Sequence, residues 1–336
     1  MSHAEDRYYV PHGSHWPIVG SIGLLFLMVG VSNWLNGAGA GFWIMLTGVA
    51  VLVIMLIGWF GTVISESQGG LYNDQVDKSF RMGMFWFIFS EVMFFAAFFG
   101  ALFYARNMSI PWLGGDSNNF FTNALLWEGY ESTWPTNGPG DVGGEFEAMP
   151  PFGLPLINTA ILLTSSITVT IAHHALIAGN RGILKLFLAL TFILGFIFVF
   201  LQAEEYIEAY QHMNLKLTSG IYGSTFFMLT GFHGMHVTIG AIMLTIIWLR
   251  VMKGHFSARN HFAFEAVAWY WHFVDVVWIG LYVFVYWMLL VSLVGDPVIS
   301  LPHGSLCCAL LRSKNIRIAN LIRHPPCEIG PDEHQD

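Results

Sequence analysis

Apolar residues run along this chain in seven long stretches, and most of the charged residues lie between those stretches. An α-helix needs roughly 20 residues to cross a hydrocarbon layer about 30 Å thick, and each stretch approaches or exceeds that length. The pattern therefore predicts an all-α protein built from seven membrane-spanning helices. The predicted helices cover approximately residues 17–36, 41–64, 83–104, 157–178, 183–203, 221–249 and 267–293.

The composition supports a membrane protein. Of the 336 residues, 55% are hydrophobic and 11% are charged, whereas charged residues make up about a quarter of an ordinary soluble domain. The net charge of -8 comes with no basic stripe that could neutralise phosphates, so no nucleic-acid partner is expected. Cys307, Cys308 and Cys327 follow the last apolar stretch, and their spacing fits no usual zinc pattern. We therefore predict no metal site in this chain and no disulfide in its membrane-spanning part.

The loops differ in their content of Lys and Arg, and this difference predicts the orientation of the helices. The basic residues on the side of the N-terminus are Arg7, Lys78, Arg81, Arg181, Lys185, Arg250, Lys253 and Arg259. Only Arg106 and Lys216 fall on the opposite side before the tail. Because loops rich in Lys and Arg stay inside the cell, the N-terminal segment 1–16 is predicted inside. Seven crossings then place the C-terminus outside.

Two segments outside the predicted helices stand apart. The outer loop 106–156 is acidic and rich in Gly and Pro, and long loops without elements of their own are usually functional or docked on a partner. The tail 294–336 is of a different kind, because it carries several basic residues although it is predicted outside. Late segments can cross a membrane despite their charge, so the prediction of seven crossings stands.

Glu91 is the most informative polar residue, because it lies well inside the third predicted helix and so near the bilayer centre. Ionisable groups at that depth are costly and are candidates for function. No Lys or Arg lies three or four positions away to pair with it, so desolvation favours the protonated acid. We predict either an acid that hydrogen-bonds a neighbouring helix, or a proton relay or ion site.

Histidines form a second set of polar residues in the predicted helices. They are His173 with His174, His233 with His236, and His272 with Asp275. Imidazole suits haem iron and copper, but the segment HGMH contains no Cys or carboxylate beside its histidines, so we predict a structural polar network instead. We expect His233 and His236 to satisfy one another, Asp275 to orient the imidazole of His272 or pair with its cation, and Gly231 and Gly234 to let helices approach closely.

Further polar groups are predicted at the helix ends. Trp59, Glu66 and Arg250 are predicted at inner ends, where aromatic and basic side chains suit lipid headgroups or simple anchoring. Glu204 and Glu205 are predicted at the outer end of the fifth helix.

The chain resembles cytochrome c oxidase subunit III, the third core subunit of the haem–copper respiratory oxidases. The resemblance runs in order over residues 12–290. The strings that carry it are FIFSEVMFFAAFF around Glu91, INTAILLTSSITVTIAHHAL at 157–176, LQAEEYIEA at 201–209, GIYGSTFFMLTGFHGMHVTIG at 220–240 and NHFAFEAVAWYWHFVDVVWIGLYVFVYW at 260–287.

The resemblance implies a fold of two sub-bundles, helices one and two within 17–64 and helices three to seven within 81–293, with a cleft that holds phospholipid. It implies that this chain carries no haem or copper, which belong to partner subunits. It also implies partners, subunits I and II and membrane phospholipids, and a role in supporting proton uptake and turnover stability of subunit I. Glu91 matches the intramembrane carboxylate of the family, and Trp59, Glu66 and Arg250 match positions that contact lipid.

The chain departs from the family pattern at two side chains and in one loop. Ser65 and Asn73 replace a basic residue and a histidine that are common in the family, which leaves the lipid headgroup open. The long loop resembles bacterial members and favours a bacterial inner membrane, with the C-terminus in the periplasm.

A quinol oxidase subunit is the alternative, but such versions typically lack helices one and two. A stand-alone proton-coupled transporter would need inverted repeats or broken helices, which the sequence does not show.

Overall fold

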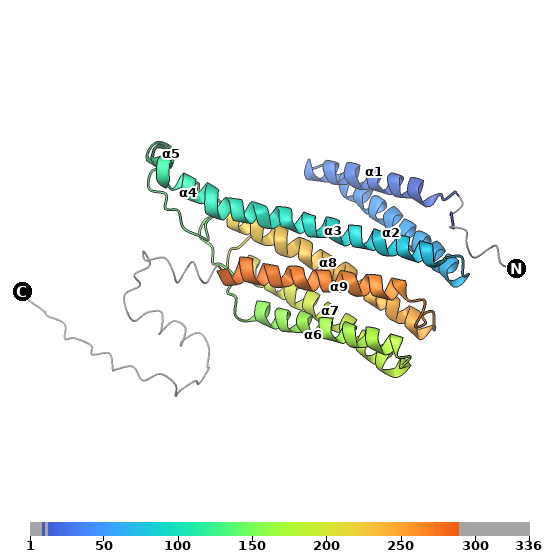
Figure 1. Ribbon diagram of the computed structural model, residues 1–336. Helices are drawn as coiled ribbons and strands as arrows, with labels where there is room; N and C mark the ends of the chain where they lie inside the picture. Colours follow the sequence, from blue (N-terminus) through green and yellow to red (C-terminus); the bar gives the residue numbers. More distant parts are fainter. Residues whose placement is uncertain (1–8, 11–12, 289–336) are drawn as a thin grey trace, which may run out of the picture. The chain divides into compact units, whose positions relative to one another are not determined.

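The computed structural model describes residues 9–10 and 13–288, and within them it contains helices and no strand (Figure 1). Seven helices are long and apolar enough to span a membrane, as the sequence predicts. They are α1 Trp16–Leu35, α2 Gly39–Gln68, α3 Asp74–Tyr104, α6 Leu154–Ile177, α7 Arg181–Gln211, α8 Gly220–Met252 and α9 Phe262–Leu281. The predicted tail 294–336, with its three cysteines, lies outside the described residues.

Several helices extend beyond the apolar stretches that predict them. α3 begins well before residue 83, because the side chain of Asn73 accepts a hydrogen bond from the backbone N–H of Val76 (3.0 Å), which caps the helix. α7 continues to Gln211 rather than ending at 203. Hydropathy marks the part of a helix that lies in lipid, whereas a helix can continue into the polar boundary.

The long loop after α3 contains elements that the sequence does not predict. α3 passes through a π-helical turn, Ala105–Ser109, directly into α4, Ile110–Leu113. A short 3₁₀ turn, Ser117–Asn119, and α5, Phe120–Leu126, follow. The expectation of a loop without elements is therefore wrong for its first part. α9 ends in the same way, in a π-helical segment, Tyr282–Trp287.

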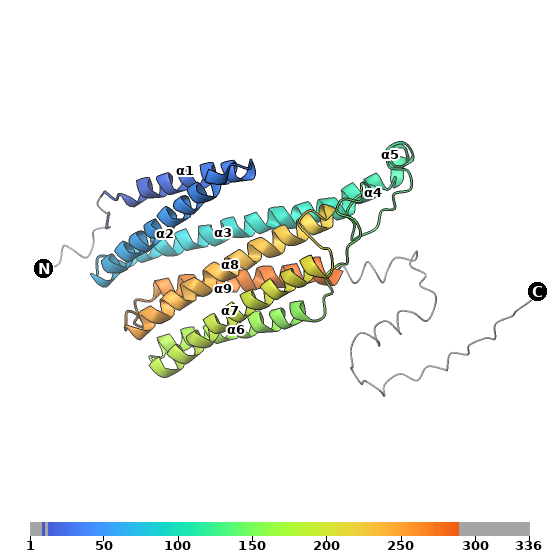
Figure 2. The ribbon, with the colours of Figure 1, turned by 180° about the vertical axis from the view of Figure 1, so that it is seen from behind.

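The helices alternate in direction, so their connections lie at two opposite ends of the bundle. Most of the described Lys and Arg residues gather at one end, and the acidic long loop lies at the other. We call one the basic end, where the connections 69–73, 178–180 and 253–261 lie, and the other the acidic end, where the connections 105–153 and 212–219 lie. Figure 2 shows both ends from behind.

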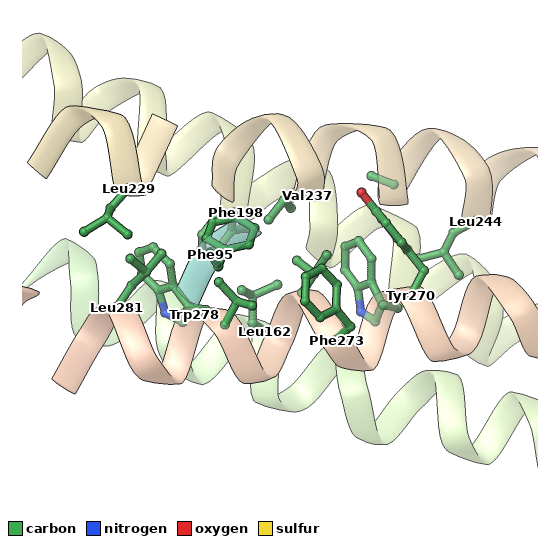
Figure 3. Packing of buried hydrophobic residues seen from close by; sticks show 14 of the residues in the cluster. Phe95, Leu162, Phe198, Leu229, Val237, Leu244, Tyr270, Phe273, Trp278 and Leu281 are labelled. Carbon is green, nitrogen blue, oxygen red and sulfur yellow. The ribbon is translucent and has the colours of Figure 1, made fainter. Parts of the chain in front are cut away.

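α6 to α9 pack side by side, and α3 packs against α8 and α9. Their core contains large aromatic side chains, among which Phe198 meets Trp278 edge to face at 4.7 Å between ring centroids (Figure 3). Trp271 is also fully buried, and a Cβ at Gly195 would lie 2.6 Å from its ring. Glycine at that position therefore gives the indole its space.

α1 and α2 form a hairpin in which the two backbones touch. A Cβ at Gly30 would overlap the backbone of Met45, and one at Gly41 would overlap the backbone of Trp34.

The close approach of helices expected at Gly231 and Gly234 of α8 is wrong. A Cβ at Gly234 would meet open space, and one at Gly231 would make only an ordinary contact. The sequence cannot assign this role, since it does not show which face of each helix meets a neighbour.

Candidate functional site

Glu91 of α3 pairs with His236 of α8 inside the membrane-spanning region. The carboxylate Oε2 lies 3.0 Å from the imidazole Nε2, and the side chains are 22% and 8% exposed. The rings of Phe94, Phe95 and Tyr270 lie around the imidazole, with centroids between 5.1 and 6.3 Å from it. The acid therefore hydrogen-bonds a neighbouring helix, which is one of the two predicted alternatives.

The second ring nitrogen of His236 determines how protons are shared in this pair. Nδ1 lies 2.6 Å from the backbone carbonyl oxygen of Phe232, and a carbonyl can only accept, so Nδ1 carries a proton. A neutral imidazole then offers Nε2 as an acceptor, and the carboxyl group of Glu91 must donate. If the proton moves across, both groups are charged. In either form one proton is shared and the net charge of the pair is zero.

His233 and His236 do not satisfy one another, and that expectation is wrong. His236 points to Glu91, whereas His233 is fully buried and stacks on Trp278, with ring centroids 5.1 Å apart. Both nitrogens of His233 lack a hydrogen-bond partner within the described residues. A spacing of three residues places two side chains on one broad face, but the neighbouring helices decide what each one meets.

The expectation that Asp275 orients His272 is wrong, because both ring nitrogens of His272 lie within hydrogen-bond distance of hydroxyl groups on α6. Ser166 of α6 hydrogen-bonds His272 Nδ1 at 2.7 Å. Thr170 lies 3.4 Å from His272 Nε2. The serine therefore orients the ring, and the sequence offered no signal that would select it from its neighbours.

A third polar group lies at the basic end and includes His173. His173 Nε2 lies 3.6 Å and His261 Nε2 3.4 Å from Glu265 Oε1. Arg81 of α3 pairs with the other oxygen of Glu265 and, through Nε, with Asp77 at 2.7 Å. Arg81, Asp77 and His261 were not predicted as members of this group. The available signal was a spacing of four, between Asp77 and Arg81 and between His261 and Glu265, which places the members of each pair on one helix face.

His174 is exposed and stacks loosely on His173, with ring centroids 6.3 Å apart. The possible ligand atoms of His173, His261 and Glu265 all lie within 4.8 Å of one another, and such a donor set suits zinc. Arg81 already neutralises Glu265, however, so the group acts as an ion-pair cluster that ties α3, α6 and α9 together. That no metal binds this chain stays a prediction.

The predicted lipid-contacting residues lie at the basic end, each in its own surroundings. Glu66 accepts hydrogen bonds from the hydroxyl groups of Tyr9 (3.0 Å) and Tyr72 (2.7 Å). Burial, followed by the hydrogen bond and the negative charge of Glu66, raises the pKa of Tyr72 above its usual value. Trp59 is 47% exposed. The guanidinium of Arg250 lies 4.6 Å from the ring centroid of Phe256.

Comparison with known proteins relates this arrangement to a family. The sequence model of the family Cytochrome c oxidase subunit III matches residues 6–125 and 116–289. The chain belongs to the cytochrome c oxidase subunit III family. The two matches meet inside the acidic-end loop and include all seven spanning helices, whereas the tail 294–336 lies beyond them.

Individual relatives agree with the family match over nearly their whole length. Cytochrome c oxidase subunit 3 of Formosania lacustris is 41% identical over 288 residues, which cover 85% of this chain and 99% of the relative. The protein of the same name from Oryctolagus cuniculus is 38% identical with the same coverage. That of Heterololigo bleekeri is 41% identical over 283 residues, 84% of this chain and 98% of the relative. The resemblance stated from the sequence is confirmed.

Proposed function

We propose that the chain is the non-catalytic third core subunit of a proton-pumping aa3-type cytochrome c oxidase, an oxidoreductase and translocase. The observation that carries the proposal is similarity over 98–99% of the length of relatives named as that subunit. In this proposal the chain packs against subunits I and II, which hold the haem and copper. The presence of α1 and α2 favours a cytochrome c oxidase over a quinol oxidase.

The Glu91–His236 pair supports an indirect role. It joins α3 to α8 at a depth where an unpaired charge is costly, and its zero net charge removes most of that cost. Aromatic rings surround the imidazole. The pair thus fixes the part of the bundle that shapes proton uptake and turnover stability in subunit I, and it performs no redox step.

Bound phospholipid is the second part of the proposal. Apolar side chains on α2 and α3 remain exposed within this chain, among them Ile57, Phe60 and Trp86. Acyl chains would cover them in a cleft between the two sub-bundles, with Trp59, Glu66 and Arg250 near the headgroups. The basic end then faces the cytoplasm of a bacterial cell, as the positive-inside rule favours, and the C-terminus lies in the periplasm.

Co-purification of the tagged full-length chain tests the proposal. Detergent extraction should bring down a larger partner with two haems and copper, which absorbance spectra and metal analysis detect. A matched purification from cells without the tag controls for unspecific capture. Purification of the chain alone, with a metal centre of its own or with proton flux in vesicles, would contradict the proposal.

A further inference from the structure

Three helices of the five-helix bundle each bury a polar side chain that has no hydrogen-bond partner among the residues that the structure describes. Asn158 of α6, Gln202 of α7 and His233 of α8 are at most 5% exposed. Both polar atoms of each side chain lack a partner within the described residues. Buried polar groups in native proteins are nearly always paired with protein or with ordered water, so these atoms require an explanation.

The helix register places the three side chains at one depth. Thr168 of α6 and Thr191 of α7 face each other at 2.8 Å. From that contact, Asn158 and Gln202 lie about 15 Å and about 16 Å toward the acidic end, at a rise of about 1.5 Å per residue. Tyr206 of α7 likewise contacts Thr230 of α8 at 2.7 Å. Gln202 lies four residues and His233 three residues from that contact, both toward the basic end, so the two side chains are nearly level.

Contacts around Trp278 link the helices that carry the three side chains. The indole N–H of Trp278 donates to Thr159, the neighbour of Asn158, at 2.9 Å. Phe198, one turn from Gln202, contacts both Trp278 and His233, and Figure 3 shows Phe198 and Trp278 together in the core. We call Asn158, Gln202 and His233 the polar layer.

Glu205 extends the polar layer by one turn toward the acidic end. It is fully buried, and Tyr286 donates a hydrogen bond to its Oε1 at 2.7 Å. Its Oε2 has no partner in the described part of the chain. The carboxyl group was predicted at a helix end, but α7 continues past it and places it in the core.

We propose that the polar layer binds a small cluster of ordered water molecules that connects Asn158, Gln202 and His233 with Glu205. An unpartnered buried polar group is destabilising, and a bilayer offers no bulk water to reduce that cost. A buried water molecule typically makes about three hydrogen bonds. The amides supply donors and acceptors, and the imidazole supplies one of each, so water matches this mixture whereas a cation would match only the acceptors. This inference does not depend on the proposed function.

A density map of the assembled complex, at a resolution that shows ordered water, tests the proposal directly. We expect separate peaks within hydrogen-bond distance, about 2.6–3.2 Å, of the polar atoms of the layer. Direct pairing of Asn158 with Gln202 and no peaks would overturn the proposal. A single ion coordinated at shorter distances would also overturn it.

X-ray radiolytic footprinting gives a second, independent readout, because it oxidises buried side chains that lie beside bound water. Trp278 should be oxidised several-fold faster than Trp271, which is equally buried on the same helix and also hydrogen-bonded, but lies about two turns away from the polar layer toward the basic end. Gln202→Leu should slow the oxidation of Trp278 and leave Trp271 unchanged. Thr191→Val, which alters a paired hydroxyl group, is the control. Equal oxidation of the two tryptophans in the unaltered protein would overturn the proposal even if Gln202→Leu does not assemble.

Discussion

The α1–α2 hairpin and the α6–α9 part of the bundle hold their helices together by different means. In the described residues of α1 and α2, every buried residue is a glycine, and the two backbones approach closely. In α6 to α9, the core contains tryptophan and phenylalanine side chains together with paired polar groups. Lipid tails are as apolar as leucine, so membrane helices associate through close packing and hydrogen bonds. This chain uses close packing in the hairpin and both means in the bundle.

The difference predicts which changes each region tolerates. A backbone cannot move aside as a flexible side chain can, so the hairpin should be intolerant of added volume at a few glycines. The bundle should be most sensitive to the loss of aromatic volume and of hydrogen-bond donors.

Gly30→Leu should separate α1 from α2, since even a Cβ there would overlap the backbone of Met45. We expect destabilisation of about 3 kcal/mol or more, at the upper limit of overpacking, measured as a lower melting temperature of the purified complex. Gly61→Leu on α2 is the matched control, because a Cβ at that position meets nothing within 4 Å. Equal melting temperatures for the two variants would refute the backbone contact.

Trp278→Phe should cost about 2–3 kcal/mol, from the lost hydrogen bond to Thr159 and from the smaller ring in a fully buried site. Trp16→Phe in the hairpin removes a similar bond, to Thr62 at 3.2 Å, but in an exposed setting. That variant should cost less than about 1 kcal/mol. Thermal unfolding of both variants measures the difference, and a larger cost for Trp16→Phe would contradict the contrast between the regions.

Glu91→Gln should leave assembly intact and change turnover or inactivation kinetics only modestly, because the amide can still donate to His236 Nε2. His236→Phe should cost about 1–3 kcal/mol, since it leaves a carboxyl group without its partner. A double-mutant cycle on thermal stability should then show coupling of about 1–2 kcal/mol. Complete loss of haem reduction in an assembled Glu91→Gln complex would contradict the indirect role.

Tyr72→Phe should have the smallest effect, below about 1 kcal/mol, because the hydrogen bond to Glu66 lies near the surface. The folded-state pKa of Tyr72 is raised, so its contribution is complete below the unfolded tyrosine pKa of about 10. It is lost as the pH rises from there through the raised folded-state value. The free energies of unfolding of the unaltered protein and of Tyr72→Phe should converge at alkaline pH. A difference between them that grows with pH would contradict this assignment.

The sequence predicted the fold well and the candidate site in part. Length and hydropathy located all seven helices, because a long apolar stretch has few other stable states in a bilayer. Glu91 was identified because its depth alone makes it unusual. Its partner His236 was placed only in a general polar network, since the pairing depends on how α3 lies against α8. Ser166 and Arg81 were missed because their residue types and positions are unremarkable until the helices pack.

The amino-acid sequence by itself thus determined how many helices cross the membrane, roughly where they lie, and to which family the chain belongs. These properties follow from local composition and residue order. Only the tertiary structure decided that Glu91 hydrogen-bonds His236, that Glu205 is buried beside Tyr286, and that glycine contacts hold α1 to α2. The reason is geometric, because each of these contacts joins residues on different helices, and the hydrophobicity of a membrane helix does not specify which of its faces meets which neighbour.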